Sequence, residues 1–90
     1  MIKVRIPAQL RTLTGGSGEV SVEGSTVGEA LKALDAAHPG FADRIFDEAG
    51  GLRRFVNVFL DDEDVRFLDG LATPIAAGQT LSIVPAVAGG

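Results

Sequence analysis

Thiol and imidazole side chains, which serve as nucleophiles, general bases and zinc ligands, are almost absent from this sequence. The chain has no cysteine and a single histidine, His38. This composition excludes a disulfide framework, a thiolate zinc site, a cysteine nucleophile and any cluster of imidazole ligands. A lone histidine can act as a general base, but His38 stands directly before Pro39 at the end of a predicted helix, which favours a capping or solvated residue.

Two polar segments have spacings that could suit ligand binding. Residues 15–18, Gly-Gly-Ser-Gly, could cradle a phosphate, but no lysine follows them and the next element is a predicted strand. The four successive carboxylates of residues 61–64 could bind calcium, but the glycine and the distal glutamate of an EF-hand loop are missing. The two patterns favour a hairpin loop and a solvated turn.

The remaining reactive group is the terminal carboxylate that follows Gly89 and Gly90. These glycines come after a predicted strand and the uncharged Pro-Ala-Val-Ala segment at residues 85–88. Proline favours an extended backbone as the chain leaves the strand, and glycine has no β-carbon. Such a tail can therefore thread a narrow channel in another protein. We expect Gly90 to react and Val87, Ala88 and Gly89 to provide the reach. An inert, frayed end is the alternative.

Length and charge limit the classes of protein and partner. Ninety residues make one small domain that buries about 60% of its unfolded surface, which argues against an independent enzyme with a deep active site. The net charge of −4 argues against a nucleic-acid or anionic-membrane partner. The chain shows neither a signal-peptide pattern nor a membrane span. We therefore expect a cytoplasmic protein that binds another protein or a small molecule, without a metal of its own.

The elements that position the tail are predicted from hydrophobic periodicity. Alternation and β-branched residues predict five strands, with the third at the centre of the sheet: residues 2–6, 19–23, 55–60, 65–67 and 80–84. Thr26 and Glu29 fit a capping box that opens a helix, and its apolar stripe is Val27, Ala30, Leu31 and Leu34. A short helical turn at residues 41–46 is expected to place Phe41 and Ile45 on the core.

This order predicts a two-layer α+β fold, with one main helix on one face of a mixed sheet and the other face open. Residues 1–84 form the domain and residues 85–90 a flexible tail. The open face would carry apolar side chains for partner docking, although scattered exposed apolar residues need no function. The residues expected to dock are Phe55, Phe59, Val84 and Pro85.

The whole sequence resembles ubiquitin-like β-grasp sulfur carriers of the MoaD/ThiS family. The resemblance is carried by the helix start at residues 26–31, the turn at 74–79, segments 54–58, 62–67 and 70–73, and the end of the chain at 83–90. Within that family the sequence is most similar to the carriers of an alternative cysteine pathway. Gln79 stands where many relatives have aspartate, a change in a turn that leaves the tail unaltered.

The resemblance implies that the chain is a protein co-substrate and not an enzyme. An E1-like adenylating and sulfurtransferase enzyme would use ATP to adenylate Gly90, and sulfur would then replace AMP to leave a thiocarboxylate. In the cysteine route the acceptor would be a cysteine synthase that depends on pyridoxal phosphate (PLP), and a zinc metallopeptidase would release the cysteine. ATP and PLP would belong to the partner enzymes.

Three other functions stay open at this point. The carrier could donate sulfur for molybdopterin, thiamine or thiosugar biosynthesis. Gly90 could instead be joined to lysines of target proteins, as in a ubiquitin-like protein modifier. Finally, the chain could be a β-grasp interaction module whose tail does no chemistry.

Overall fold

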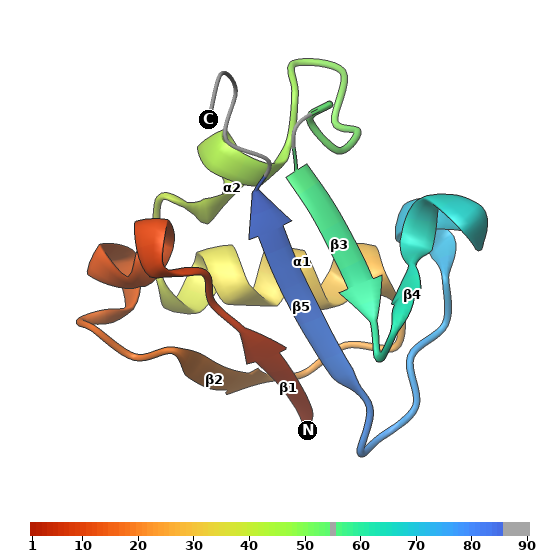
Figure 1. Ribbon diagram of the computed structural model, residues 1–90, viewed down its shortest axis with the longest axis horizontal. Helices are drawn as coiled ribbons and strands as arrows, with labels where there is room; N and C mark the ends of the chain where they lie inside the picture. The colour runs from red at the N-terminus through yellow and green to blue at the C-terminus, as the bar shows by residue number, and fades with distance from the viewer. Residues whose placement is uncertain (55, 86–90) are drawn as a thin grey trace.

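A five-stranded mixed sheet with one long helix across one of its faces forms the molecule (Figure 1). The structure, a computed structural model, describes residues 1–54 and 56–85. In the order in which they lie side by side, the strands are β2 (Glu19–Val22), β1 (Ile2–Arg5), β5 (Thr80–Pro85), β3 (Val56–Leu60) and β4 (Glu63–Asp64). β1 is parallel to β5, and the other neighbours are antiparallel. The predicted α+β arrangement is confirmed.

The connection between β1 and β2 contains a 3-10 helix, η1 (Ala8–Thr14), which the sequence did not predict. Gly15 ends η1 in the left-handed region at φ 67°, where a side chain would be strained. The Ile6 N–H donates to the Gly18 carbonyl at 2.9 Å and closes the hairpin. The glycines of residues 15–18 therefore serve a hairpin loop, as predicted.

The long helix α1 (Val27–Ala37) begins and ends where the sequence predicts. The Thr26 hydroxyl accepts a hydrogen bond from the Glu29 N–H at 3.2 Å, which satisfies one free donor of the first turn. The Glu29 carboxylate accepts from the Ser25 N–H at 2.9 Å, one residue earlier than in a capping box. At the other end the His38 N–H donates to the Leu34 carbonyl at 2.8 Å, so His38 caps the helix.

A short second helix, α2 (Phe41–Ile45), follows α1 and buries Phe41 and Ile45 as predicted. One carboxylate oxygen of Asp35 accepts hydrogen bonds from the Gly40 N–H at 3.2 Å and from the Ala42 N–H at 2.9 Å. A side chain of α1 thus fixes the start of α2, which is too short to be stable without such contacts.

Two predictions about the second half of the sheet are wrong. The central strand is β5 and not β3, because the N-terminal strand pairs in parallel with the C-terminal one. Residues 65–67 form a 3-10 helix, η2 (Val65–Phe67), and the short strand β4 comes before them. The Asp64 carboxylate accepts from the Arg66 N–H at 2.8 Å, a local bond that competes with the strand ladder. A further 3-10 helix, η3 (Gly70–Ala72), follows.

The core lies between the sheet and α1. The whole predicted stripe of the helix is buried, and it packs with alternate residues of the strands: Val27, Ala30, Leu31 and Leu34 against Ile2, Val4, Val22, Val56, Val58, Leu60, Leu81 and Ile83. No buried side-chain nitrogen or oxygen in the described part of the chain lacks a hydrogen-bond partner. Within residues 1–54 and 56–85, no helix has the length and apolar character needed to cross a membrane.

Candidate functional site

The structure follows the chain to Pro85, the last residue of β5, which pairs with Val56 at the start of β3. Pro85, predicted to begin the tail, therefore belongs to the sheet ladder. Outside the described residues lie the predicted tail residues and one predicted docking residue: Val87, Ala88, Gly89, Gly90 and Phe55. The candidate site is the end of the sheet from which the tail leaves, where β5 ends and β3 begins (Figure 1). We call it the tail end of the sheet.

Hydrogen bonds hold the segment between α2 and β3 against the tail end. The Arg53 N–H donates to the Ile45 carbonyl at 2.9 Å, and the Val56 N–H donates to the Arg53 carbonyl at 3.1 Å. The Arg53 Nε donates to the Asp43 carbonyl at 3.0 Å. These bonds connect α2, through Arg53, to the strand that pairs with Pro85.

Arg66 of η2 also forms hydrogen bonds at the tail end. Its Nη1 donates to Oδ1 of Asn57 at 2.8 Å, and its Nη2 donates to the Arg53 carbonyl. Asn57 pairs with Val84, so the guanidinium is tied to the strand pair that ends β5. Val84 and Pro85 therefore pair with a strand, β3, that is itself hydrogen-bonded to Arg66 of η2 and to Arg53.

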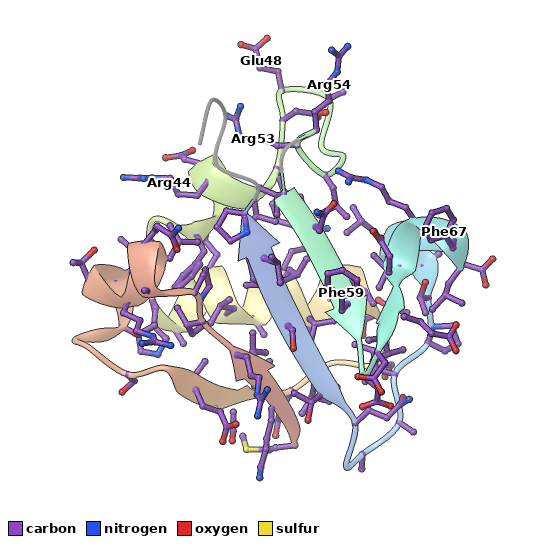
Figure 2. All side chains as sticks on the ribbon, in the orientation of Figure 1. Arg44, Glu48, Arg53, Arg54, Phe59 and Phe67 are labelled. Atoms are coloured by element: carbon purple, nitrogen blue, oxygen red, sulfur yellow. The ribbon has the colours of Figure 1, made fainter. Side chains whose placement is uncertain are left out.

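The sheet face opposite α1 carries two of the predicted docking residues. Phe59 is half-buried on β3 and lies on the face turned away from α1 (Figure 2), while Val84 on β5 is 44% exposed. Phe59 pairs with Ser82 and Val84 pairs with Asn57, so the two apolar side chains are diagonal neighbours. The exposure of this face is as predicted, and its docking role stays a prediction.

Phe67 is an exposed aromatic residue that the sequence analysis did not single out. It is 88% exposed, whereas Val65, two residues earlier, is fully buried. In the predicted strand both would point the same way, because the period of a strand is two. The 3-10 helix η2 has three residues per turn and sends Phe67 outward instead. The side-chain capping by Asp64 is the sequence signal that could have revealed this turn.

The other candidate ligand groups have structural roles. One Asp61 carboxylate oxygen accepts from the Thr80 N–H and the other from the Gln79 side-chain amide, both at 3.1 Å, so this residue fastens the start of β5. Among the described residues no group of three histidine, aspartate or glutamate side chains is arranged to bind a metal. Residues 61–62 form a turn, as predicted, and residues 63–64 form the edge strand β4, which the sequence did not predict.

An open groove of about 580 Å³ lies on the helix side of the molecule. It is bordered by α1, α2 and η3, with Phe46 and Leu71 among its lining residues. Its two carboxylates, Glu29 and Asp35, accept the backbone hydrogen bonds that cap the two α-helices. These acids are engaged in holding the fold, which leaves the tail end as the candidate functional site.

Comparison with known proteins gives likenesses along the whole chain. Residues 4–90 match the model of the ThiS family. The sulfur carrier protein CysO of Mycobacterium tuberculosis is 48% identical over 91 residues, which cover 99% of this chain and 98% of CysO. The crystal structure of that CysO has a TM-score of 0.92 at 46% identity, covering 97% of this chain and 100% of the other.

Two further solved structures are similar. A chain in the BexX/CysO complex of Amycolatopsis orientalis has a TM-score of 0.94 at 46% identity, with complete coverage of both chains. SAMP1 of Haloferax volcanii has a TM-score of 0.79 at 36% identity, covering 99% of this chain and 98% of the other. These likenesses confirm the expected ubiquitin-like β-grasp fold.

Proposed function

Because the chain belongs to the ThiS family and is a CysO-like sulfur carrier protein rather than an enzyme, we propose that it carries sulfur as a thiocarboxylate on Gly90 and donates it for cysteine biosynthesis. The observation that carries the proposal is the likeness to CysO over 99% of this chain, together with the match to the ThiS family, which runs to residue 90. The end of β5 also supports the proposal, because it pairs with β3, and Asn57 of β3 is hydrogen-bonded to Arg66.

The proposed chemistry needs only the terminal carboxylate of this chain. A carboxylate resists substitution because its oxygen is a poor leaving group. An E1-like partner therefore joins the Gly90 carboxylate to the α-phosphate of ATP, and pyrophosphate leaves. Hydrosulfide then attacks the acyl carbon, AMP departs with the electron pair of the broken C–O bond, and a thiocarboxylate remains on Gly90. ATP acts at the partner, and so does PLP at the step that accepts the sulfur.

In the cysteine route, a PLP-dependent cysteine synthase receives the tail and a zinc metallopeptidase later releases cysteine from Gly90. Residues 1–84 serve as the docking domain, and residues 85–90 as the tail that enters each enzyme. Docking uses the open sheet face through Phe55, Phe59, Val84 and Pro85. The BexX/CysO complex supports this part of the proposal, since it shows that a similar carrier associates with a second protein.

Intact-mass measurement tests the proposal directly. The protein is incubated with ATP, sodium sulfide and an E1-like adenylating enzyme from the same organism. We expect the mass to rise by the difference between one sulfur and one oxygen, with fragmentation placing the change on Gly90. A variant lacking Gly90 and a variant with one residue added after it are expected to gain nothing while unfolding at the wild-type temperature. Continued absence of the mass change in the wild type would refute the carrier function.

The acceptor is tested separately by supplying the thiocarboxylated protein to candidate enzymes. Transfer to the cysteine synthase with O-phosphoserine supports the cysteine route. Transfer to a molybdopterin, thiamine or thiosugar enzyme, with none to the cysteine synthase, would replace that acceptor while keeping the carrier function.

One observation favours a second candidate function, protein modification. The small archaeal modifier protein 1 of Haloferax volcanii is 40% identical over 72 residues, 79% of this chain and 78% of the relative. On this hypothesis the activated Gly90 acyl group is transferred to lysines of other proteins. Denaturing gels of cells that express a tagged chain would show covalent ladders that disappear when Gly90 is deleted.

A further inference from the structure

The guanidinium of Arg66 joins two segments that meet at the tail end of the sheet. Its Nη1 donates to Oδ1 of Asn57 at 2.8 Å, and its Nη2 donates to the Arg53 carbonyl. The Arg66 side chain is exposed and takes no part in the buried core. Its two bonds hold Asn57 of β3 and the backbone of Arg53 at a set position relative to η2.

Asn57 is the polar member of an otherwise apolar strand. The sequence of β3 is Val-Asn-Val-Phe-Leu, and asparagine is among the residues that strands disfavour. Asn57 pairs with Val84 of β5, one residue before Pro85. Its side-chain oxygen gives Arg66 an acceptor on the strand that pairs with the last described residues of the chain. The side chain of Asn57 thus connects η2 to the strand pair at the tail end.

The last described pair of the ladder, Val56 with Pro85, has few backbone donors. Pro85 has no N–H. The Val56 N–H donates within its own segment, to the Arg53 carbonyl at 3.1 Å. The same carbonyl accepts from the Arg66 guanidinium. Side-chain bonds from Arg66 therefore add support where the backbone ladder has least.

Arg66 is itself held firmly at its backbone. Val65, directly before it, is fully buried, and the Asp64 carboxylate accepts from the Arg66 N–H at 2.8 Å. A guanidinium is planar and carries its donors in a fixed fork, so an anchored arginine can hold two acceptors at a set separation. A lysine has one nitrogen on a flexible stem and would not hold both acceptors in this way.

We propose that Arg66 is a positioning residue for the reaction of Gly90. Its two side-chain bonds hold the end of β5, and so set the point and direction from which the tail departs. The proposal rests on the proposed function, in which Gly90 is the residue that reacts. Five residues follow Pro85, and at most about 3.5 Å per residue gives a reach of about 17 Å. A change of direction at Pro85 displaces Gly90 at the other end of this reach, and a misplacement of about 1 Å can slow a reaction about a hundredfold.

Variants at both ends of the side-chain bond test the proposal. Arg66→Ala removes both donors, Arg66→Lys keeps the charge without the fork, and Asn57→Ala removes one acceptor. Lys3→Ala is the control, because it removes the same charge where β1 pairs with Thr80, the first residue of β5. The kcat and the KM for the carrier are measured in a thiocarboxylation assay with ATP, sodium sulfide and the E1-like adenylating enzyme from the same organism. Amide hydrogen exchange at Val84 reports how firmly the strand end is held, and thermal unfolding confirms that the variants fold.

We expect Arg66→Ala and Arg66→Lys to lower kcat about fivefold to tenfold and to leave the KM within about twofold. The reason is that the domain still docks while Gly90 reaches the reactive position less often. Asn57→Ala is expected to lower kcat about threefold, and to add nothing further when combined with Arg66→Ala, because the bond it would break is already lost. Exchange at Val84 should accelerate several-fold in the Arg66 variants, and Lys3→Ala should match the wild type in every measurement.

A wild-type kcat in Arg66→Ala would overturn the proposal. A wild-type kcat in Arg66→Lys would do so too, since it would assign the effect to charge alone, and a raised KM at unchanged kcat would make Arg66 a docking residue instead. If the wild type itself gains no sulfur, the proposed function fails. Exchange at Val84 then still decides whether Arg66 holds the end of β5, and unchanged exchange in Arg66→Ala would refute that.

Discussion

Ile83 and Val84 are neighbours on β5 whose side chains lie on opposite faces of the sheet. The same substitution made at each position therefore distinguishes an effect on stability from an effect on docking. Ile83 is 3% exposed in the core and Val84 is 44% exposed on the open face. Threonine keeps the β-branched shape that a strand favours at both positions. The two variants, Ile83→Thr and Val84→Thr, therefore differ mainly in what surrounds the new hydroxyl.

The expected magnitudes follow from burial. At Ile83 the loss of apolar volume costs about 1 kcal/mol, and a buried hydroxyl without a partner costs about 1–3 kcal/mol more. The sum of about 2–4 kcal/mol lowers the Tm of a domain of this size by about 10–25 °C. At Val84 the free energy of unfolding is expected to change by less than about 0.5 kcal/mol, because the hydroxyl stays in water.

Calorimetry gives the Tm, and the thiocarboxylation assay gives the KM for the carrier at a temperature where both variants are folded. We expect Ile83→Thr to lower the Tm and keep the wild-type KM, and Val84→Thr to keep the Tm and raise the KM several-fold by weakening apolar contact with the enzyme. Similar losses of stability in both variants would refute the assignment of the two faces. An unchanged KM for Val84→Thr would refute the docking role of the open face.

Three further predictions concern the two α-helices. Thr26→Ala removes the acceptor for the Glu29 N–H and should lower the free energy of unfolding by about 1 kcal/mol; chemical denaturation measures this, and no loss would show that the cap is unimportant. Gly24→Ala places a Cβ 2.7 Å from a backbone nitrogen of α1 and should cost about 1–3 kcal/mol, whereas Gly51→Ala, with its nearest contact at 3.8 Å, serves as the control and should cost far less. Asp35→Ala removes the acceptor shared by two N–H groups at the start of α2, so amide hydrogen exchange in α2 should accelerate before that in α1; equal acceleration in both would contradict a local role.

Much of the fold was predictable because its signals are local. The capping pattern at Thr26, the apolar stripe of α1 and the alternation in β3 and β5 each depend on residues a few positions apart, and the structure confirms them. The terminal glycines and the absence of cysteine likewise directed attention to the chain end from sequence alone. The resemblance that named the family also required only the sequence, and the comparisons confirm it.

The remaining features depend on contacts between residues that are distant in the chain. The parallel pairing of β1 with β5, which puts β5 at the centre, joins the first and last strands and leaves no local pattern. The outward turn of Phe67 is different, because it follows from a local bond: the Asp64 carboxylate caps the 3-10 helix that stands where a strand was expected.

Sequence by itself determined which residue types are present, because composition is enough to exclude cysteine chemistry and clusters of imidazole ligands, and the order of residues places two glycines after a strand. Only the tertiary structure determines which residues lie around the end of β5. Arg53 is more than 30 positions before Pro85 in the chain, and it comes to the tail end through its backbone bond to Ile45 and the pairing of β3 with β5. Such pairings arise from the joint packing of the sheet and α1, whose free energy no short segment contains.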